Sequence, residues 1–269
     1  MIEALQYEFM RNAVAAGLLA AVACGIVGVY VVVKRMVFIS GGIAHTSFGG
    51  VGLGYFLGIN PIIGALLFAL GSGVAIGVMT RRTRLPEDTA IGVLWALGMA
   101  LGVVLIGLTP GYAPDLMSYL FGNILTVPAG DLLLMLVLDA IILGMVIALY
   151  KEYFVVAFDE EYATAVGMPV ERLWLLLLGM IALTVVVLIR VVGMILVIAL
   201  LTFPAAMARR FTHSMKAMMA LAVAFGAAFT IGGLALSYAL RLPSGATIIL
   251  LSGCSLAIVL AVTSRRSRG

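Results

Sequence analysis

The chain has 269 residues, of which 64% are hydrophobic and only 10% are charged. A soluble domain carries about 25% charged residues and could not bury this much apolar surface, so the composition excludes an ordinary soluble fold. The net charge of +4 is spread between apolar runs and forms no basic stripe, which argues against a nucleic-acid partner. We therefore expect an all-α polytopic membrane protein that contacts lipid.

The apolar runs and the residues that interrupt them predict nine membrane-spanning helices in a single permease domain over residues 1–269. In chain order they lie near residues 13–33, 36–58, 61–79, 88–108, 131–150, 173–189, 191–208, 217–240 and 244–263. The second and third are divided at Asn60-Pro61, because the residue before a proline disfavours helix. The sixth and seventh meet at 190–193 with almost no loop, so one of them could be a half-span, which would give eight crossings.

Basic residues between the spans indicate the orientation in the membrane. Thirteen fall on one side of this arrangement: Lys34, Arg35, Arg81, Arg82, Arg84, Lys151, Arg172, Arg209, Arg210, Lys216, Arg265, Arg266 and Arg268. Only Arg11, Arg190 and Arg241 fall on the other. By the positive-inside rule, the N-terminus lies outside the cell membrane and the C-terminus lies in the cytoplasm.

Small residues recur at helical spacing within the spans. Glycines four residues apart let helix backbones approach closely in lipid, where no hydrophobic force drives association. We assign this packing role to Gly50, Gly54 and Gly58 in the second span and to Gly193 and Pro204 in the seventh.

Catalytic motifs are missing from the sequence, and ionisable residues within the spans are scarce. No Walker loop, HExxH motif or hydrolytic triad is present, so the chain is not expected to be an enzyme. Ionisable groups in lipid are costly and usually functional, which makes His45 and Asp139 candidates for a translocation pathway. Their scarcity favours a permease driven by a separate motor over an ion-coupled carrier.

Two connecting segments are longer than the rest. The outer one includes a short interfacial helix that we predict near residues 116–125. The inner one, residues 151–172, is expected to form a short amphipathic helix that stops at Gly167-Met168-Pro169. Phe158, Tyr162 and Val166 have the spacing of one apolar helix face. The segment is either a docking surface or a solvated loop.

Five ordered segments resemble the zinc and manganese ABC permeases known as the ABC-3 family. They are SGGIAHTSFGGV at 40–51, DTAIG at 88–92, FGNIL at 121–125 followed by Asp131, AFDEEYATAVGMPV at 157–170 and VGMILVIALLTFPAA at 192–206. One position departs from the family pattern, because relatives commonly carry Asp four residues before the histidine of the second span and this chain has Gly41.

The resemblance implies a homodimeric or closely paired permease with no permanently bound cofactor. The transported divalent ion would be zinc, manganese or iron. His45 would contact the ion, with Asp88 as a further pathway candidate. Expected partners are a second copy of the permease, two cytoplasmic ATP-binding subunits and an extracytoplasmic metal-binding protein. The coupling contact would use Phe158, Asp159, Glu160, Tyr162, Ala163, Val166 and Gly167.

Three other readings stay open at this point. A permease for a metal chelate or cobalamin belongs to the same transport class, although such proteins are usually longer. A proton- or sodium-coupled carrier would transport without ATP, and a membrane scaffold would not transport at all.

Overall fold

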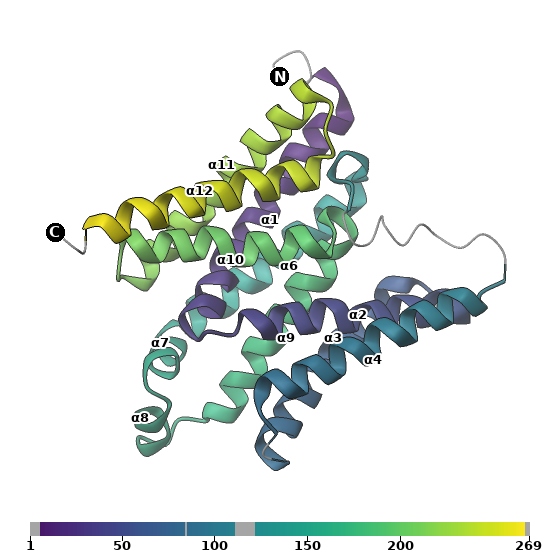
Figure 1. Ribbon diagram of the computed structural model, residues 1–269. Coiled ribbons are helices and arrows are strands. Elements are labelled where there is room, and N and C mark those ends of the chain that lie inside the picture. The colour runs from purple at the N-terminus through teal and green to yellow at the C-terminus, as the bar shows by residue number, and fades with distance from the viewer. Residues whose placement is uncertain (1–5, 84, 111–121, 267–269) are drawn as a thin grey trace. The chain divides into compact units, whose positions relative to one another are not determined.

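The computed structural model describes residues 6–83, 85–110 and 122–266, and this part of the chain is entirely helical (Figure 1). It contains eleven α-helices and a short 3-10 helix, η2. The bounds are α1 (Glu8–Val33), α2 (Val37–Leu57), α3 (Pro61–Arg82), α4 (Glu87–Leu108), η2 (Ile124–Thr126), α6 (Ala129–Ala148), α7 (Tyr150–Phe158), α8 (Glu160–Ala165), α9 (Val170–Val192), α10 (Met194–Phe211), α11 (Met215–Leu240) and α12 (Ser244–Arg266). The outer interfacial helix predicted near 116–125 lies largely outside the described residues.

Eight of the described helices are long and apolar enough to cross a membrane: α1, α3, α4, α6, α9, α10, α11 and α12. The glycine-rich α2 has 21 residues and no charged side chain, so it is the ninth long helix. The expectation of eight to nine spans is therefore confirmed.

The junction between α9 and α10 is sharp. Gly193 has φ 79° and ψ 158°, a backbone conformation open essentially to glycine alone, and it separates the two helices. The 23 residues of α9 and the 18 of α10 each meet the length and composition of a span, so neither is a half-span.

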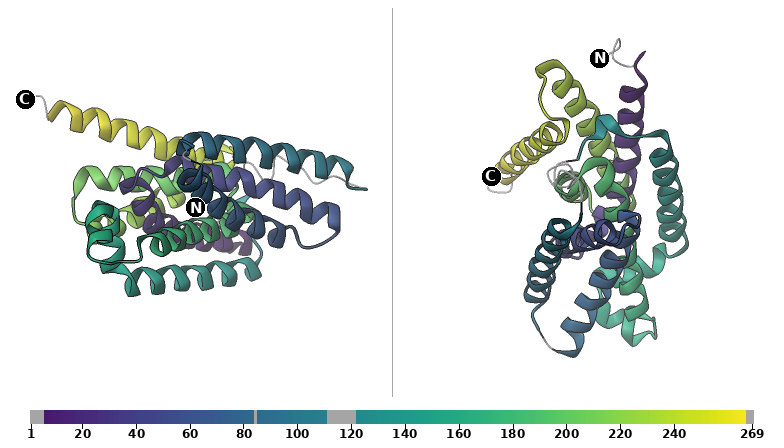
Figure 2. Two further views of the ribbon diagram at one scale, coloured as in Figure 1. Left: turned by 90° about the horizontal axis from the view of Figure 1, so that it is seen from below. Right: turned by 90° about the vertical axis from the view of Figure 1, so that its right-hand side faces the viewer.

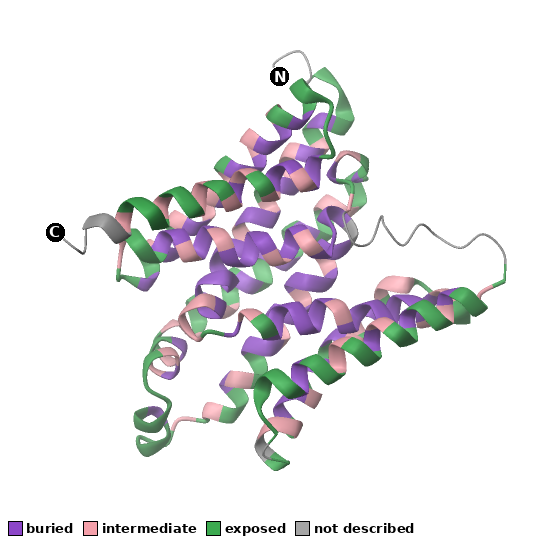
Figure 3. Ribbon diagram, in the orientation of Figure 1, coloured by how far each residue is buried: buried purple, intermediate pink, exposed green. Residues whose placement is uncertain are grey.

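The chain divides into two compact units. The first contains residues 1–35, 117–145 and 188–269, and α1 packs against both α10 and α11 within it (Figure 2). Backbones approach closely there, because a β-carbon on Gly28 would collide with the carbonyl of Leu201 and one on Gly25 would lie 2.7 Å from the Val223 nitrogen. Figure 3 shows the result, with α1 buried along most of its length.

The second unit contains residues 36–116 and 146–187, and α2 packs between α3 and α4 within it. Gly50 faces the backbone of Gly64, and a β-carbon on Gly54 would lie 2.6 Å from the Pro61 α-carbon. Asn60 caps α3 by accepting a hydrogen bond from the Ile62 amide at 3.0 Å, which explains the division at Asn60-Pro61.

Gly58 does not have the packing role that its spacing suggested. No atom lies within 4 Å of a β-carbon built there, and its φ of 68° places it in the left-handed region. Its amide donates to the carbonyl of Tyr55, so the residue terminates α2 instead of joining two helices.

Candidate functional site

His45 lies on α2 and stacks on Trp95 of α4. Their ring centroids are 4.0 Å apart and the planes differ by 11°. The stack is possible because α4 approaches α2 through its own glycines: a β-carbon on Gly98 would lie 2.6 Å from the Thr46 α-carbon, and one on Gly102 would lie 2.7 Å from the Phe48 carbonyl oxygen.

The hydroxyl groups that flank His45 are already engaged by the helix itself. Thr46 donates to the Gly42 carbonyl at 2.7 Å and Ser47 donates to the Ala44 carbonyl at 2.6 Å. The Nδ1 atom of His45 is buried and has no hydrogen-bond partner among the described residues. A buried nitrogen without a hydrogen-bond partner is unfavourable. A ligand that bound to this imidazole nitrogen would remove that cost.

Few potential metal ligands surround His45 in the described structure. Among the described residues, no group of three or more His, Cys, Asp or Glu side chains could hold a metal ion. Gly41 lies one helical turn before His45 and is buried, so this position supplies no ligand. A single imidazole can contact an ion but does not by itself bind it tightly.

Within the second unit, the structure does not bring the candidate Asp88 to His45. Asp88 is exposed in the first turn of α4, about 10 Å along the helix axis from Trp95, where a carboxylate stabilises the helix dipole. Asp139 lies on α6 in the first unit, whereas His45 belongs to the second. Asp139 is only 4% exposed, and its Oδ2 atom has no hydrogen-bond partner within the described residues.

The segment expected to be one cytoplasmic helix is broken at Asp159. The backbone of Asp159 is extended, with φ −149° and ψ 94°, and its side chain accepts a hydrogen bond from the Tyr162 amide at 2.8 Å. Asp159 therefore ends α7 and caps α8. Gly167 closes α8 with φ 78°, while the Met168 amide donates to the Ala163 carbonyl at 3.0 Å.

This break changes the predicted docking face. Phe158, Tyr162 and Val166 are each more than half exposed, but Phe158 is on α7 and the other two follow the break, so they do not form one continuous helical stripe. Ala163 is fully buried and faces the chain's own interior, which is incompatible with direct contact to a partner. Glu160 is exposed at the start of α8.

The helix α7 is held by a buried aromatic residue and presents others outward. Tyr153 is buried, and this burial raises the pKa of its phenol to about 12. Tyr150, Phe154 and Phe158 follow at four-residue intervals, with ring centroids 6.3 and 5.0 Å apart. The rings of Phe154 and Phe158 are exposed, so α7 presents an aromatic surface of its own before the break.

Two further segments meet in the first unit. A β-carbon on Gly122 would collide with the backbone of Val192 and Gly193, so the loop before α6 sits against the α9–α10 junction. Asn12 of α1 holds the same loop by donating to the Val127 carbonyl at 3.2 Å. Pro204 is buried inside α10.

Sequence reasoning missed Trp95 and the contact between Gly122 and Gly193. Trp95 lies seven residues after Asp88, on the side of α4 that also contacts Gly42 through Ile91. That helical spacing was a usable signal. The Gly122 contact had no local signal, because it joins residues far apart in the chain.

The fold and the site define an all-helical membrane permease with no nucleotide-binding motif. The model of the ABC 3 transport family matches residues 6–263, and the chain belongs to this family. It is thus a permease subunit of a transport system and not an enzyme.

Relatives agree over nearly the whole chain. An uncharacterized membrane protein of Synechocystis is 50% identical over 266 residues, covering 99% of this chain and 94% of the relative. The manganese transport system membrane protein MntC of Listeria monocytogenes is 34% identical over 248 residues, covering 92% and 88%. The solved structure of PsaBC from Streptococcus pneumoniae in complex with Fab matches with a TM-score of 0.87 at 33% identity, covering 96% of this chain and 93% of that chain.

Proposed function

We propose that the chain is the membrane permease subunit of an ATP-binding cassette importer that carries Mn²⁺ into the cytoplasm. The observation that carries this proposal is the similarity to MntC of Listeria monocytogenes, a protein named for manganese transport that aligns with 92% of the chain. A bulky chelate or cobalamin would need a wide cavity, whereas a bare ion does not. Zn²⁺ and Fe²⁺ also accept imidazole and are the competing cargoes.

In this proposal His45 contacts the ion during passage. Support comes from its unsatisfied, buried Nδ1 atom and from the absence of other free polar groups beside it on α2 among the described residues. With Gly41 in place of a carboxylate, the contact carries no fixed negative charge, which favours rapid release over storage.

The driving force would come from two cytoplasmic ATP-binding subunits that dock on the α7–α8 segment. Its exposed Phe158, Tyr162 and Val166 support this role, since aromatic and aliphatic side chains exposed together are typical of interfaces. A second copy of the permease and an extracytoplasmic metal-binding protein would complete the importer.

The orientation follows from the charge distribution, with the N-terminus outside and the C-terminus inside. Reporter fusions after residues 160, 212 and 269 should all have cytoplasmic activity. External activity at residue 160 would rule out docking of a cytoplasmic ATPase on α7–α8.

The pathway assignment is tested by uptake at limiting Mn²⁺ in vesicles that contain the assembled transporter. His45→Ala should reduce the initial rate about tenfold, the effect of about 1.4 kcal/mol at one contact. The matched control is His213→Ala, because His213 is the chain's other histidine and is exposed between α10 and α11. Equal rates for the two variants would remove His45 from the pathway.

A further inference from the structure

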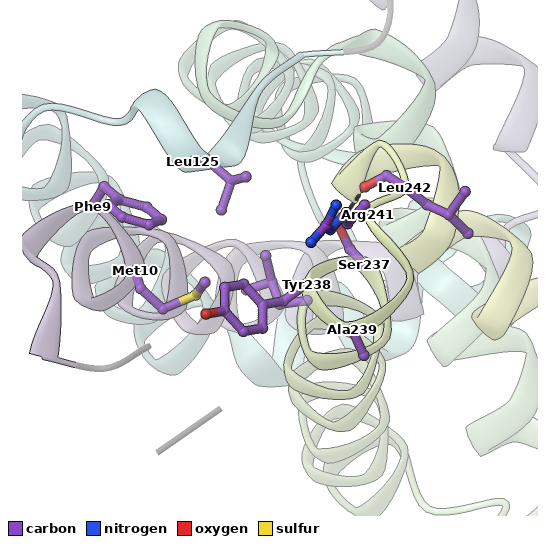
Figure 4. A pocket seen from close by; sticks show the side chains of 9 residues that line it. Phe9, Met10, Leu125, Ser237, Tyr238, Ala239, Arg241 and Leu242 are labelled. Carbon is purple, nitrogen blue, oxygen red and sulfur yellow. Dashed lines mark hydrogen bonds between the residues drawn. The ribbon is translucent and has the colours of Figure 1, made fainter. Parts of the chain in front are cut away.

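A cavity of about 520 Å³ lies at the end of the first unit where α1 begins and α11 ends (Figure 4). All of its walls belong to that unit. The lining residues are Phe9, Met10, Leu125, Leu234, Ser237, Tyr238, Ala239, Arg241 and Leu242. This volume is in the range of ordinary ligand sites.

Arg241 occupies a backbone position that normally belongs to glycine. Its φ of 55° and ψ of 41° are left-handed, and it ends α11 by donating its amide to the Ser237 carbonyl. Ser237 fixes the same turn, because its hydroxyl donates to the Leu242 carbonyl at 2.6 Å and its carbonyl accepts from the Leu242 amide at 3.1 Å. The left-handed backbone is unfavourable for a residue with a side chain. A favourable interaction of the guanidinium with a ligand would explain why arginine is found at this position.

The positive charge of Arg241 has no acidic partner among the described residues. Its guanidinium lines the cavity, while the Tyr238 hydroxyl on another wall points toward Met10 (Figure 4). The cavity therefore offers one cation, which is suited to bind a phosphate group.

Apart from Ser237, whose hydroxyl is engaged in the turn, the remaining walls are apolar. Phe9 and Leu242 are 43% and 49% exposed, and Met10 and Leu234 are buried behind them. Both α1 and α11 are long and apolar enough to span the membrane, so the cavity lies at the ends of two spans, where lipid headgroups are found. Tyr238 is half exposed, as expected for tyrosine at a membrane interface.

We propose that this cavity binds one phospholipid, with its phosphate on Arg241 and the first part of its acyl chains against Phe9 and Leu242. A soluble anion would use the cation but not the apolar walls, whereas a neutral lipid would use the walls but not the cation. On the orientation proposed above, the lipid belongs to the outer leaflet.

Native mass spectrometry of the purified full chain tests this inference with dioleoyl phosphatidylglycerol and, in parallel, dioleoylglycerol, which lacks the phosphate. We expect one retained phospholipid per chain and about tenfold weaker retention of dioleoylglycerol, the effect of losing a charge-assisted contact. Equal retention of the two lipids would overturn the assignment of the phosphate. Displacement of the phospholipid by millimolar inorganic phosphate would identify a soluble anion site instead and would also overturn it.

Variants separate binding from folding. Arg241→Gly removes the charge and also relieves the left-handed backbone, so it should lower phospholipid retention about tenfold without lowering the melting temperature. Arg172→Ala, which removes an exposed arginine in the first turn of α9, is the matched control and should retain the lipid fully. Full retention by Arg241→Gly would contradict the proposal.

Discussion

The imidazole of His45 and the indole of Trp95 lie nearly parallel, 4.0 Å apart between ring centroids. This stack covers one face of the imidazole and restricts rotation of the ring, so a ligand must approach a nitrogen in the ring plane. Trp95 is therefore placed to orient His45, and it also provides an optical signal at the proposed metal contact.

The chain has only two tryptophans, so Trp174→Phe leaves Trp95 as the single indole fluorophore. Mn²⁺ that contacts His45 should change the fluorescence of Trp95 saturably, because the stacked ring is the indole's immediate neighbour. Mg²⁺, which prefers oxygen ligands, should have no such effect. Adding His45→Ala should abolish the response.

The variant that keeps the other tryptophan provides the control. Trp95→Phe leaves Trp174, whose ring packs near Gly77 of α3, and its fluorescence should not respond to Mn²⁺. A response that persists without His45, or that appears equally in the Trp174 protein, would contradict a metal contact at the stack.

The α9–α10 junction predicts a large stability effect at Gly193. Its φ of 79° and ψ of 158° are unfavourable for alanine, so Gly193→Ala should destabilise the protein by about 1–3 kcal/mol. Thermal unfolding in detergent measures this change. Gly144→Ala is the matched control, since nothing lies within 4 Å of a β-carbon in that α6 position and helix propensity should leave stability equal or higher. Equal melting temperatures for the two variants would show that the junction is not constrained.

The α7–α8 segment predicts a docking effect without a folding effect. Tyr162 is 58% exposed, so Tyr162→Ser should leave the permease stable and weaken its affinity for the ATP-binding subunit about tenfold or more, as expected for an aromatic interface residue. Affinity of the purified pair measures this directly. Glu171→Gln, at the start of α9, is the control and should bind normally.

Substitutions at Ala163 and Gly167 would not test docking. Arginine at the fully buried Ala163 and tryptophan at Gly167, with its φ of 78°, would both disrupt α8 itself. Normal assembly of Tyr162→Ser with the ATP-binding subunit would indicate that the exposed segment is a solvated loop.

Asp139 provides a separate test of the pathway. Asp139→Asn keeps the volume of this buried side chain and removes its charge, so it should preserve stability and lower Mn²⁺ uptake about tenfold if the carboxylate assists the ion. Uptake and melting temperature are measured on the same preparation. Unchanged uptake would reduce Asp139 to a packing residue.

Apolar run lengths were enough to predict the spans, because the cost of exposing backbone to lipid fixes where helices begin and end. The division at Asn60-Pro61 was equally readable, since a proline and a capping side chain act locally. The break at Asp159 was not, because the same aspartate fits either inside the first turn of a helix or at its cap, and tertiary packing of Ala163 selects the second. The His45–Trp95 stack depends on how closely α2 and α4 approach, which the glycines permit but do not specify.

Transport of Mn²⁺ by this permease is proposed to depend on ATP hydrolysed by a separate subunit. Mn²⁺ accumulation can be measured in sealed vesicles that contain the permease with its ATP-binding subunit, supplied with the metal-loaded delivery protein. Accumulation should require ATP and should survive ionophores that collapse proton and sodium gradients. Accumulation without ATP that ceases when those gradients collapse would contradict this proposal and identify an ion-coupled carrier.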